Sequence, residues 1–462
     1  MYVDTIAAIA TAPGEGGIGI VRLSGPEALP IALQIFRSGR SLRVPDPAQI
    51  ESHRMYYGGI VDPADGNVVD EVMLVWMRAP RSYTREDVVE IHCHGGYVPV
   101  RAVQSLCLRH GARLAEPGEF TLRAFLNGRI DLSQAEAVAG IVTAQTGRSL
   151  DLAIGELRGR MTERLRPARD ALVETLAFLD AAADFPDDEI PALDVDAALK
   201  RIVDVLDQVV ASAETGLLYR EGVQIAIVGR PNVGKSSLLN RLIGQERAIV
   251  TDIAGTTRDV VSETITLDGI PATLLDTAGI TETADVVEAI GVERSRHALT
   301  TSALLIVVLD RSQPLTDADR QVLDLVDQRL DPAGVVYVLN KADLPARLDT
   351  DELPLPPGAP LVTLSTVTGA GMDELKHTLH DVAVGQSEAA TRPALVTARQ
   401  FDALRRAQEH AMAALEAREM GVPLDLLAVD VRAALYAVGE ITGEHVGEAV
   451  LDEIFSRFCI GK

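Results

Sequence analysis

The first part of the chain, residues 1–119, is organised as short apolar runs separated by glycine and polar residues. Three of these runs, IGIVRLSG, DEVMLVWM and DVVEIHCHGG, have the length and alternation of strands. A stretch with helical spacing, VPVRAVQSLCLRHG, follows the third run and ends at a glycine, which suits a helix C-terminus. We therefore predict a small N-terminal α/β domain over residues 1–119.

Helical spacing replaces this pattern in residues 120–219 and returns in residues 385–462. The first stretch is interrupted at DFPDDEIPALD, where two prolines disfavour a continuous helix. Near the end, LDEIFSRF places its four apolar residues at i, i+3, i+4 and i+7, which predicts one apolar helix face. The two stretches are predicted to form the first and second parts of a helical domain.

Between them, residues 220–384 alternate apolar strand-like runs with helical stretches. The runs VQIAIVG, ATLLDT, ALLIVVLD, GVVYVLN and APLVTLS fit a doubly wound parallel sheet. The simplest arrangement makes the flanking helical stretches one domain into which this α/β unit is inserted, with its ends close together. The predicted fold class is therefore α/β plus α.

The composition agrees with a globular chain of two to four domains, since 47% of the 462 residues are hydrophobic. Its three cysteines, Cys93, Cys107 and Cys459, give neither a disulfide framework nor a CxxC metal spacing. We therefore expect a reducing, cytoplasmic compartment. The apolar runs are strand-sized, and we expect no segment to span a membrane.

The formal net charge of -24 argues against an all-over basic surface of the kind that binds nucleic acid nonspecifically. Residues 148–169 depart from this acidic background because they hold six arginines. We expect this segment to be a solvated helix face, and the sequence leaves open whether it contacts RNA.

A phosphate-binding loop is predicted where IAIVGRPNVGKSSLLN follows a strand and opens a helix. Gly229, Gly234, Lys235 and Ser236 stand in the GxxxxGK[ST] register. The loop amides and the helix N-terminus would face the phosphates, and Lys235 would reach the β- and γ-phosphates. The Ser236 hydroxyl suits Mg²⁺.

Two later motifs, each at the end of a predicted strand, complete a nucleotide site. In DTAG, Asp276 supplies a carboxylate near Mg²⁺ and the Gly279 amide can meet the γ-phosphate. In NKAD, formed by Asn340, Lys341 and Asp343 around an alanine, the carboxylate accepts from the ring N–H and the amine of guanine. Adenine lacks this pair of donors, so the predicted substrate is GTP. The segment LSTVTG stands where a further base-contacting loop is expected.

Two parts of the GTPase chemistry are left open by these motifs. The loop TDIAGTTRD contains Thr256 and Thr257, and either suits closure over Mg²⁺ and the γ-phosphate. Ile280 follows DTAG where common GTP switch proteins have a glutamine that orients the attacking water. The acids downstream are equal candidates for that role: Glu282, Asp285, Glu288 and Glu293.

Two other patterns have simpler explanations than a ligand site. GEGGIG matches a dinucleotide fingerprint, but a strand pattern follows it where the fingerprint needs a helix. His92, Cys93 and His94 alternate faces if they lie on a strand, so all three cannot converge on one metal ion. We expect structural or packing roles for them.

Several stretches outside the GTPase motifs are distinctive, namely APGEGGIGIVRLSG, EPGEFTLRAFLNGRIDLSQAEAV, DFPDDEI and the terminal FCIGK. Together with GRPNVGKSSLLN, TDIAGTTRD, DTAG and NKAD, they closely resemble the MnmE (TrmE) family within the TrmE-Era-EngA-like GTPases. The resemblance covers essentially the whole chain. The motifs and the resemblance together imply these GTP-binding residues: Asn232, Val233, Gly234, Lys235, Ser236, Ser237, Thr251, Asp252, Ile253, Ala254, Gly255, Thr256, Thr257, Asp276, Thr277, Ala278, Gly279, Asn340, Lys341, Ala342 and Asp343.

The resemblance implies an answer to the missing glutamine. In this family K⁺ takes the place of an arginine finger when two G domains face each other. The positions that match its K⁺ site are Asn232, Thr251, Ile253 and Thr256. Thr257 is then left to bind Mg²⁺ together with Ser236, and the family's water-positioning glutamate matches Glu288. The catalytic residues implied in this way are Glu288, Lys235 and Asn232.

The resemblance also implies a second site, formed by the N-terminal domain and the C-terminus. The family binds a formyl-tetrahydrofolate there as one-carbon donor across a homodimer. The matching positions are Arg22, Glu90, Arg129 and Lys462. Cations suit the folate carboxylates and a carboxylate suits the donors of the pterin ring. The amphipathic helix before FCIGK would tether the tail and so bring Cys459 to this site.

The function implied by the resemblance is a K⁺-stimulated GTPase that acts on tRNA with a flavoprotein partner, MnmG, in a heterotetramer. The two would add the carboxymethylaminomethyl group to C5 of the wobble uridine of certain tRNAs, while GTP hydrolysis drives opening and closing of the G domain. An alternative from another class is a GTPase switch in ribosome assembly, because related GTPases share the same G motifs. A third is a folate-dependent transferase with a regulatory G domain.

Overall fold

The computed structural model describes residues 4–184, 193–245, 262–275, 303–327, 334–385 and 393–462. The chain divides into two compact units, residues 1–139 with 439–462, and residues 140–438. No helix in the described ranges combines the length and the apolar character that crossing a membrane requires. The predicted fold class, α/β plus α, is confirmed, as the two units show in turn.

The first unit is built on a seven-stranded sheet in the order β3-β4-β5-β6-β2-β1-β7. Its strands are β1 (Ile6–Ile9), β2 (Ile18–Ser24), β3 (Phe36–Ser38), β4 (Met55–Val61), β5 (Val68–Met77), β6 (Val88–His94) and β7 (Arg113–Leu114). Neighbouring strands are antiparallel except β1 and β7. The three strands predicted from the apolar runs of this region are confirmed as β2, β5 and β6.

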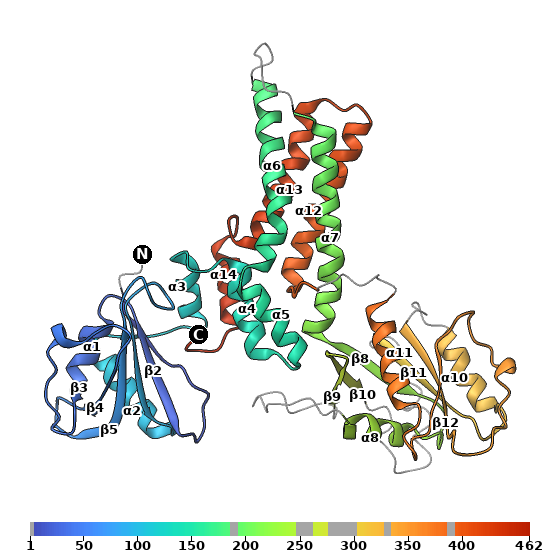
Figure 1. The fold of residues 1–462 in the computed structure, drawn as a ribbon, viewed down its shortest axis with the longest axis horizontal. Helices are drawn as coiled ribbons and strands as arrows, with labels where there is room; N and C mark the ends of the chain where they lie inside the picture. The colour runs from blue at the N-terminus through green and yellow to red at the C-terminus, as the bar shows by residue number, and fades with distance from the viewer. Residues whose placement is uncertain (1–3, 185–192, 246–261, 276–302, 328–333, 386–392) are drawn as a thin grey trace. The chain divides into compact units, whose positions relative to one another are not determined.

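Two helices, α1 (Ala28–Ile35) and α2 (Tyr97–Arg109), pack against this sheet (Figure 1). Val21, Leu23 and Ile91 point into the core beneath them and are fully buried. Because side chains alternate along a strand, Arg22 and Glu90 lie on the opposite face of the sheet. That face carries the cavity described below.

The C-terminal residues belong to the first unit. Helices α3 (Glu119–Leu126), α4 (Leu132–Thr143) and α14 (Glu448–Ser456) contribute to one apolar cluster. The apolar face predicted for LDEIFSRF is confirmed, since Phe455 and Phe458 are buried in this cluster. The last helix is thereby packed against α3 and α4.

The second unit contains a six-stranded sheet in the order β13-β12-β11-β8-β10-β9. Its strands are β8 (Val223–Val228), β9 (Ser262–Leu267), β10 (Ile270–Leu275), β11 (Leu304–Asp310), β12 (Val335–Asn340) and β13 (Leu361–Thr363). The strands are parallel except that β9 runs antiparallel to β10. This edge strand differs from the all-parallel prediction because only a two-residue turn separates it from β10, and so short a turn joins antiparallel strands.

The helices of the second unit fall into two groups. Beside the sheet lie α8 (Lys235–Gln245), α10 (Asp317–Asp327) and α11 (Met372–Val384). A bundle is formed by α6 (Arg160–Asp184), α7 (Val195–Glu221), α12 (Ala398–Glu419) and α13 (Leu424–Thr442), which Figure 1 shows side by side. Ion pairs join the two sequence-distant halves of the bundle: Arg418 to Asp196, and Arg432 to Asp180. Short 3₁₀ turns occupy Pro47–Gln49 in the first unit and Thr350–Glu352 in the second.

The arginine-rich segment 148–169 is not simply a solvated face, so that expectation was partly wrong. In α6, Arg164 Nη1 donates to Ser212 Oγ of α7 at 2.8 Å. Arg148, in α5 (Gly147–Leu157), places its guanidinium 6.0 Å from the centre of the Tyr219 ring. These arginines therefore join α5 and α6 to α7, an arrangement that depends on contacts between distant parts of the sequence.

Candidate functional site

The loop predicted from GRPNVGKS lies between β8 and α8. Since β8 pairs with β10 on one side and β11 on the other, the loop stands where the strand order reverses, the usual ligand position in open α/β sheets. Gly234 adopts a φ of 101°, and a Cβ at this residue would lie 2.2 Å from Asn340 Nδ2. The loop therefore requires glycine at this position, for both its conformation and its close packing.

Lys235 begins α8 and its side chain folds back over the loop. Its Nζ donates to Gly229 O and to Arg230 O, each at 2.8 Å. Burial, together with the nearby charge of Arg230, lowers the pKa of Lys235. An anionic ligand would offset this effect by stabilising the ammonium. Ser236 and Ser237 are exposed in the first turn of α8, where the helix N-terminus favours phosphate.

Asn340 joins this loop to the segments predicted to contact the base. Its side chain is fully buried, and its Nδ2 donates to Val233 O at 2.8 Å. Its Oδ1 accepts from Thr366 N, in LSTVTG, at 3.2 Å. A single amide thus connects the phosphate loop, NKAD and LSTVTG, and the three segments form one site.

The two charged residues of NKAD are held by separate partners. Ser365 Oγ donates to Asp343 Oδ1 at 2.5 Å, which orients the carboxylate. Lys341, at a φ of 66°, extends its Nζ to Asp310 Oδ2 at 2.6 Å. Burial alone would raise the pKa of Asp310, but its bonds to Lys341 and Ser312 outweigh burial and hold that pKa below its ordinary value. Asp310 therefore stays charged and keeps Lys341 in place.

Two acids that the sequence analysis missed, Asp310 and Asp319, support this site. Asp310 ends β11 and has only 4% of its surface exposed. Asp319, in α10, accepts from Arg230 Nε at 3.0 Å and so fixes the phosphate loop from outside. Asp310 could have been found, since it ends the apolar run ALLIVVLD at the ligand-binding edge of the sheet. No local sequence pattern of this kind marks Asp319.

The donor set of this site fits a guanine nucleotide with Mg²⁺. The glycine cradle, the Lys235 ammonium and the helix N-terminus suit phosphates, and the oriented Asp343 carboxylate suits guanine. The exposed hydroxyl of Ser236 suits Mg²⁺. Asn232, predicted for K⁺, is exposed at a φ of 64° within the phosphate loop.

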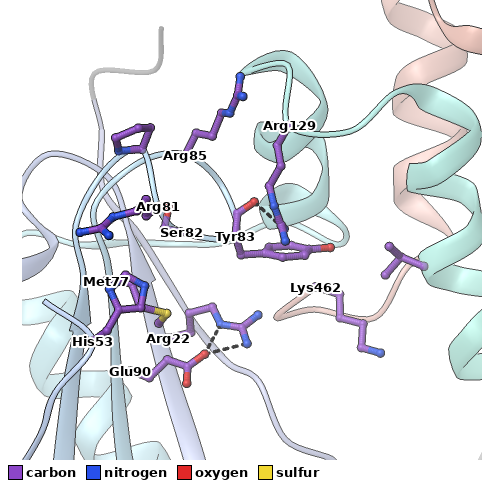
Figure 2. Close-up of a pocket in the computed structure, with 12 residues that line it drawn as sticks. Arg22, His53, Met77, Arg81, Ser82, Tyr83, Arg85, Glu90, Arg129 and Lys462 are labelled. Atoms are coloured by element: carbon purple, nitrogen blue, oxygen red, sulfur yellow. Dashed lines mark hydrogen bonds and ion pairs between the residues drawn. The ribbon is translucent and has the colours of Figure 1, made fainter. Parts of the chain in front are cut away.

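The first unit holds a separate cavity of about 780 Å³. Residues from its sheet, from the loop after β5, from the segment between α3 and α4 and from the C-terminus line it, among them Arg22, Tyr83, Glu90, Arg129 and Lys462 (Figure 2). The four residues predicted for folate are therefore brought together, although they are up to 440 positions apart in the sequence.

Arg22 connects the sheet to the end of the chain. Residues 22 and 90 stand opposite each other in the pairing of β2 with β6, and Arg22 Nε donates to Glu90 Oε1 at 2.9 Å. Arg22 Nη1 donates to Gly461 O at 3.2 Å. Gly461 has a φ of 95°, and a Cβ there would lie 2.3 Å from Ile9 O, so only glycine lets the tail approach β1 this closely. This contact delivers Lys462 to the cavity.

Tyr83, which the sequence analysis did not single out, also lines this cavity. Arg129 Nη1 donates to Tyr83 O at 3.0 Å, and its guanidinium lies 4.7 Å from the centre of the Tyr83 ring. The Tyr83 hydroxyl is 2.9 Å from Thr121 Oγ1. Cys459 is exposed and is not among the described residues that line the cavity, so its part in the site stays a prediction.

Comparison with known protein families matches most of the chain. Residues 132–459 match the family model described as the MnmE helical domain, and residues 5–129 match the GTP-binding protein TrmE N-terminus. The chain belongs to the MnmE family of tRNA modification GTPases. It is therefore a GTPase that takes part in tRNA modification, as the resemblance predicted.

Full-length relatives support the assignment to the MnmE family. The tRNA modification GTPase MnmE of Roseiflexus sp. (strain RS-1) is 48% identical, with 100% of both chains covered. The protein of the same name from Enterococcus faecalis (strain ATCC 700802 / V583) is 45% identical, with 100% of this chain and 99% of that one covered. Among solved structures, the G domain of the T. maritima FeoB iron transporter is 28% identical, covers 35% of this chain and 98% of its own, and gives a TM-score of 0.27.

Part of the predicted MnmE-family site lies outside the described residues. This applies to the K⁺-binding and Mg²⁺-binding loop, residues 251–257, to DTAG with Asp276 and Gly279, and to Glu288. Residues 232–237 and 340–343 are described and lie around the connected loops at the edge of the sheet. Their roles in binding and catalysis stay predictions.

Proposed function

We propose that this chain is a K⁺-stimulated GTPase that acts with an MnmG flavoprotein to add the carboxymethylaminomethyl group to C5 of the wobble uridine in certain tRNAs. The observation that carries the GTPase part is the buried Asn340 amide, which connects the phosphate loop to both base loops. A phosphate site and a guanine site are thereby held at a fixed separation. GTP hydrolysis would drive the opening and closing of the G domain.

Each residue of the site has its own role in GTP hydrolysis. Lys235 neutralises phosphate charge, Ser236 with Thr257 binds Mg²⁺, and Asp343 selects guanine. Asn232, Thr251, Ile253 and Thr256 form the proposed K⁺ site, and Glu288 positions the attacking water. A bound K⁺ supplies positive charge where an arginine finger acts in other GTPases, a contribution of about 10³ to 10⁵ in rate, or about 4 to 7 kcal/mol.

GTP turnover in matched K⁺ and Na⁺ buffers tests the cation proposal. We expect turnover to fall by at least about tenfold in Na⁺, because the charge that replaces the arginine finger is lost. Asn232→Ala should bring the ratio of the two rates close to one. The matched control is Asn240→Ala, which changes an exposed asparagine on α8. This variant should leave the ratio of the K⁺ and Na⁺ turnover rates unchanged. Equal rates for the unmodified chain in the two salts would contradict the proposal.

We propose that the cavity of the first unit binds formyl-tetrahydrofolate. The support is its chemistry: Glu90 can accept from the amine and amide donors of a pterin, and Arg129 and Lys462 can pair with carboxylates. Arg22 orients the Glu90 carboxylate through their ion pair, and its bond to Gly461 O keeps Lys462 at the cavity. A homodimer built on this unit is part of the proposal.

Nucleoside analysis of bulk tRNA tests the modification itself. A strain that lacks this protein should lose the carboxymethylaminomethyl uridine, and the wild-type gene should restore it while Gly234→Ala should not. An unchanged uridine profile would instead favour the ribosome-assembly switch. Light scattering of the purified chain, alone and mixed with MnmG, tests the homodimer and the heterotetramer, which a monomeric mass in both samples would contradict.

A further inference from the structure

The cavity of the first unit is lined by more positive charge than the proposed contacts use. Four of its cationic side chains form no ion pair within the described residues: Arg81, Arg85, Arg129 and Lys462. Arg85 Nη1 donates to Asn127 O at 3.0 Å, and Arg129 donates to Tyr83 O. These acceptors are neutral carbonyls, so they orient the guanidinium groups without cancelling their charge.

The cavity offers almost no compensating negative charge. Glu90 is the one side-chain carboxylate among the described residues that line it, and it is already paired with Arg22 at 2.8 Å. The formal net charge of the chain is -24, so four unpaired cations around one cavity run against the average composition. Like charges gathered in a cleft repel one another and raise the local concentration of anions. The arrangement is therefore stabilised by a ligand that carries several negative charges.

The cations and the carboxylate lie at different places around the cavity. Figure 2 shows Arg22 and Glu90 on one side of Tyr83 and Arg85 on the other, with Lys462 on the C-terminal tail. Arg81 and Arg85 come from the loop between β5 and β6, which also carries Tyr83. A ligand that fits this distribution has a neutral, donor-rich head near Glu90 and an extended polyanionic tail.

We propose that the cavity takes formyl-tetrahydrofolate in its oligo-γ-glutamyl form, with a tail of three or more glutamates. The inference rests on the folate site proposed above. A tail of one glutamate carries two carboxylates, and each further γ-linked glutamate adds one. A triglutamate tail therefore carries as many carboxylates as the cavity has unpaired cations. Arg81 and Arg85 are the residues that distinguish the long tail from the short one.

Binding of 5-formyl-tetrahydrofolate with one, three and five glutamates to the full chain tests this inference by isothermal titration. The triglutamate should bind about tenfold more tightly than the monoglutamate, because two further cation–carboxylate contacts each contribute a few-fold. The ratio of the two affinities should shrink as salt is raised from about 50 mM to about 500 mM, since exposed charges are screened. The pentaglutamate should gain little over the triglutamate.

Paired substitutions assign the effect to the loop cations. The double variant Arg81→Gln/Arg85→Gln should bring the triglutamate to monoglutamate affinity ratio close to one. The double variant Arg40→Gln/Arg43→Gln removes the same charge from two exposed arginines that do not line the cavity, and it should keep the ratio. If the affinity ratio fell to the same extent in both double variants, the effect would be one of general charge, and the inference would be overturned.

The outcomes separate this inference from the folate proposal. Monoglutamate binding with a ratio near one overturns the inference and leaves the folate site standing. Failure of every form to bind the full chain overturns both. Should the ratio be near one while a short RNA oligonucleotide displaces the bound folate, the cations serve RNA phosphates and the inference is wrong.

Discussion

Glu156 of α5 makes the second unit sensitive to pH. It is 2% exposed, and neither of its carboxylate oxygens accepts a hydrogen bond from a side chain of the described residues; the backbone N–H groups of Met161 and Leu395 lie nearby. Burial raises the pKa of Glu156 from its ordinary 4.5 to about 7, and the charges of Arg164 and Arg160 offset only part of that effect. The side chain is therefore neutral at acidic pH and forced to ionise in a buried position above neutral pH.

The direction of the resulting pH dependence follows from proton binding. Between pH 4.5 and about 7 the folded state holds more protons on Glu156 than the unfolded state, so stability falls as the pH rises through this window. The difference between the two pKa values corresponds to about 3 kcal/mol at pH 8. Glu156→Gln keeps the volume and removes the ionisation. We expect the variant to be more stable than the wild type by up to about 3 kcal/mol at pH 8, and by less than about 1 kcal/mol at pH 5.

The stability difference between Glu156→Gln and wild type can be measured locally, by hydrogen exchange and mass spectrometry on peptides from residues 147–184. The rates are corrected for intrinsic exchange at each pH. A local method is needed because the single tryptophan, Trp76, lies in the first unit and does not report on α5. Glu163→Gln, an exposed glutamate on α6, is the control and should change little. A difference between Glu156→Gln and wild type that is the same at pH 5 and pH 8 would refute the reasoning.

Three further changes test the nucleotide site and the tail. Asp310→Asn should weaken binding of fluorescent GDP and GTP by a similar factor, about tenfold, because Lys341 loses its charged partner; unchanged affinity for both would rule out a positioning role. Gly234→Ala should abolish nucleotide binding in the same titration without lowering the protection of the bundle helices, because its Cβ would collide with the Asn340 amide; wild-type affinity would contradict this packing. Gly461→Ala should weaken folate binding about as much as deletion of Lys462, because the tail can no longer reach β1; a variant that binds folate normally would show that the tail contact is dispensable.

Much of the nucleotide site could be predicted because its motifs are contiguous. The residues of GRPNVGKS and of NKAD act through the shape of a short loop that follows a buried strand, and both the apolar run and the loop residues can be read locally. Asp310 and Asp319 were missed for the opposite reason. Each acts on a residue from another segment, Asp310 on Lys341 and Asp319 on Arg230, and no local pattern marks such a pair.

The sequence by itself determined the fold class, the GTPase motifs and the family, because these depend on apolar periodicity and on short runs of residues. Only the tertiary structure decided which distant residues meet: the glycine of the tail on β1, the unpaired cations around Tyr83, and the buried carboxylate of Glu156. The physical reason is that burial and charge pairing are properties of a place in the folded chain. Asp310 and Glu156 are both buried acids, yet their pKa values shift in opposite directions. The bonds of Asp310 to Lys341 and Ser312 outweigh its burial, whereas the burial of Glu156 outweighs the charges of its neighbouring arginines.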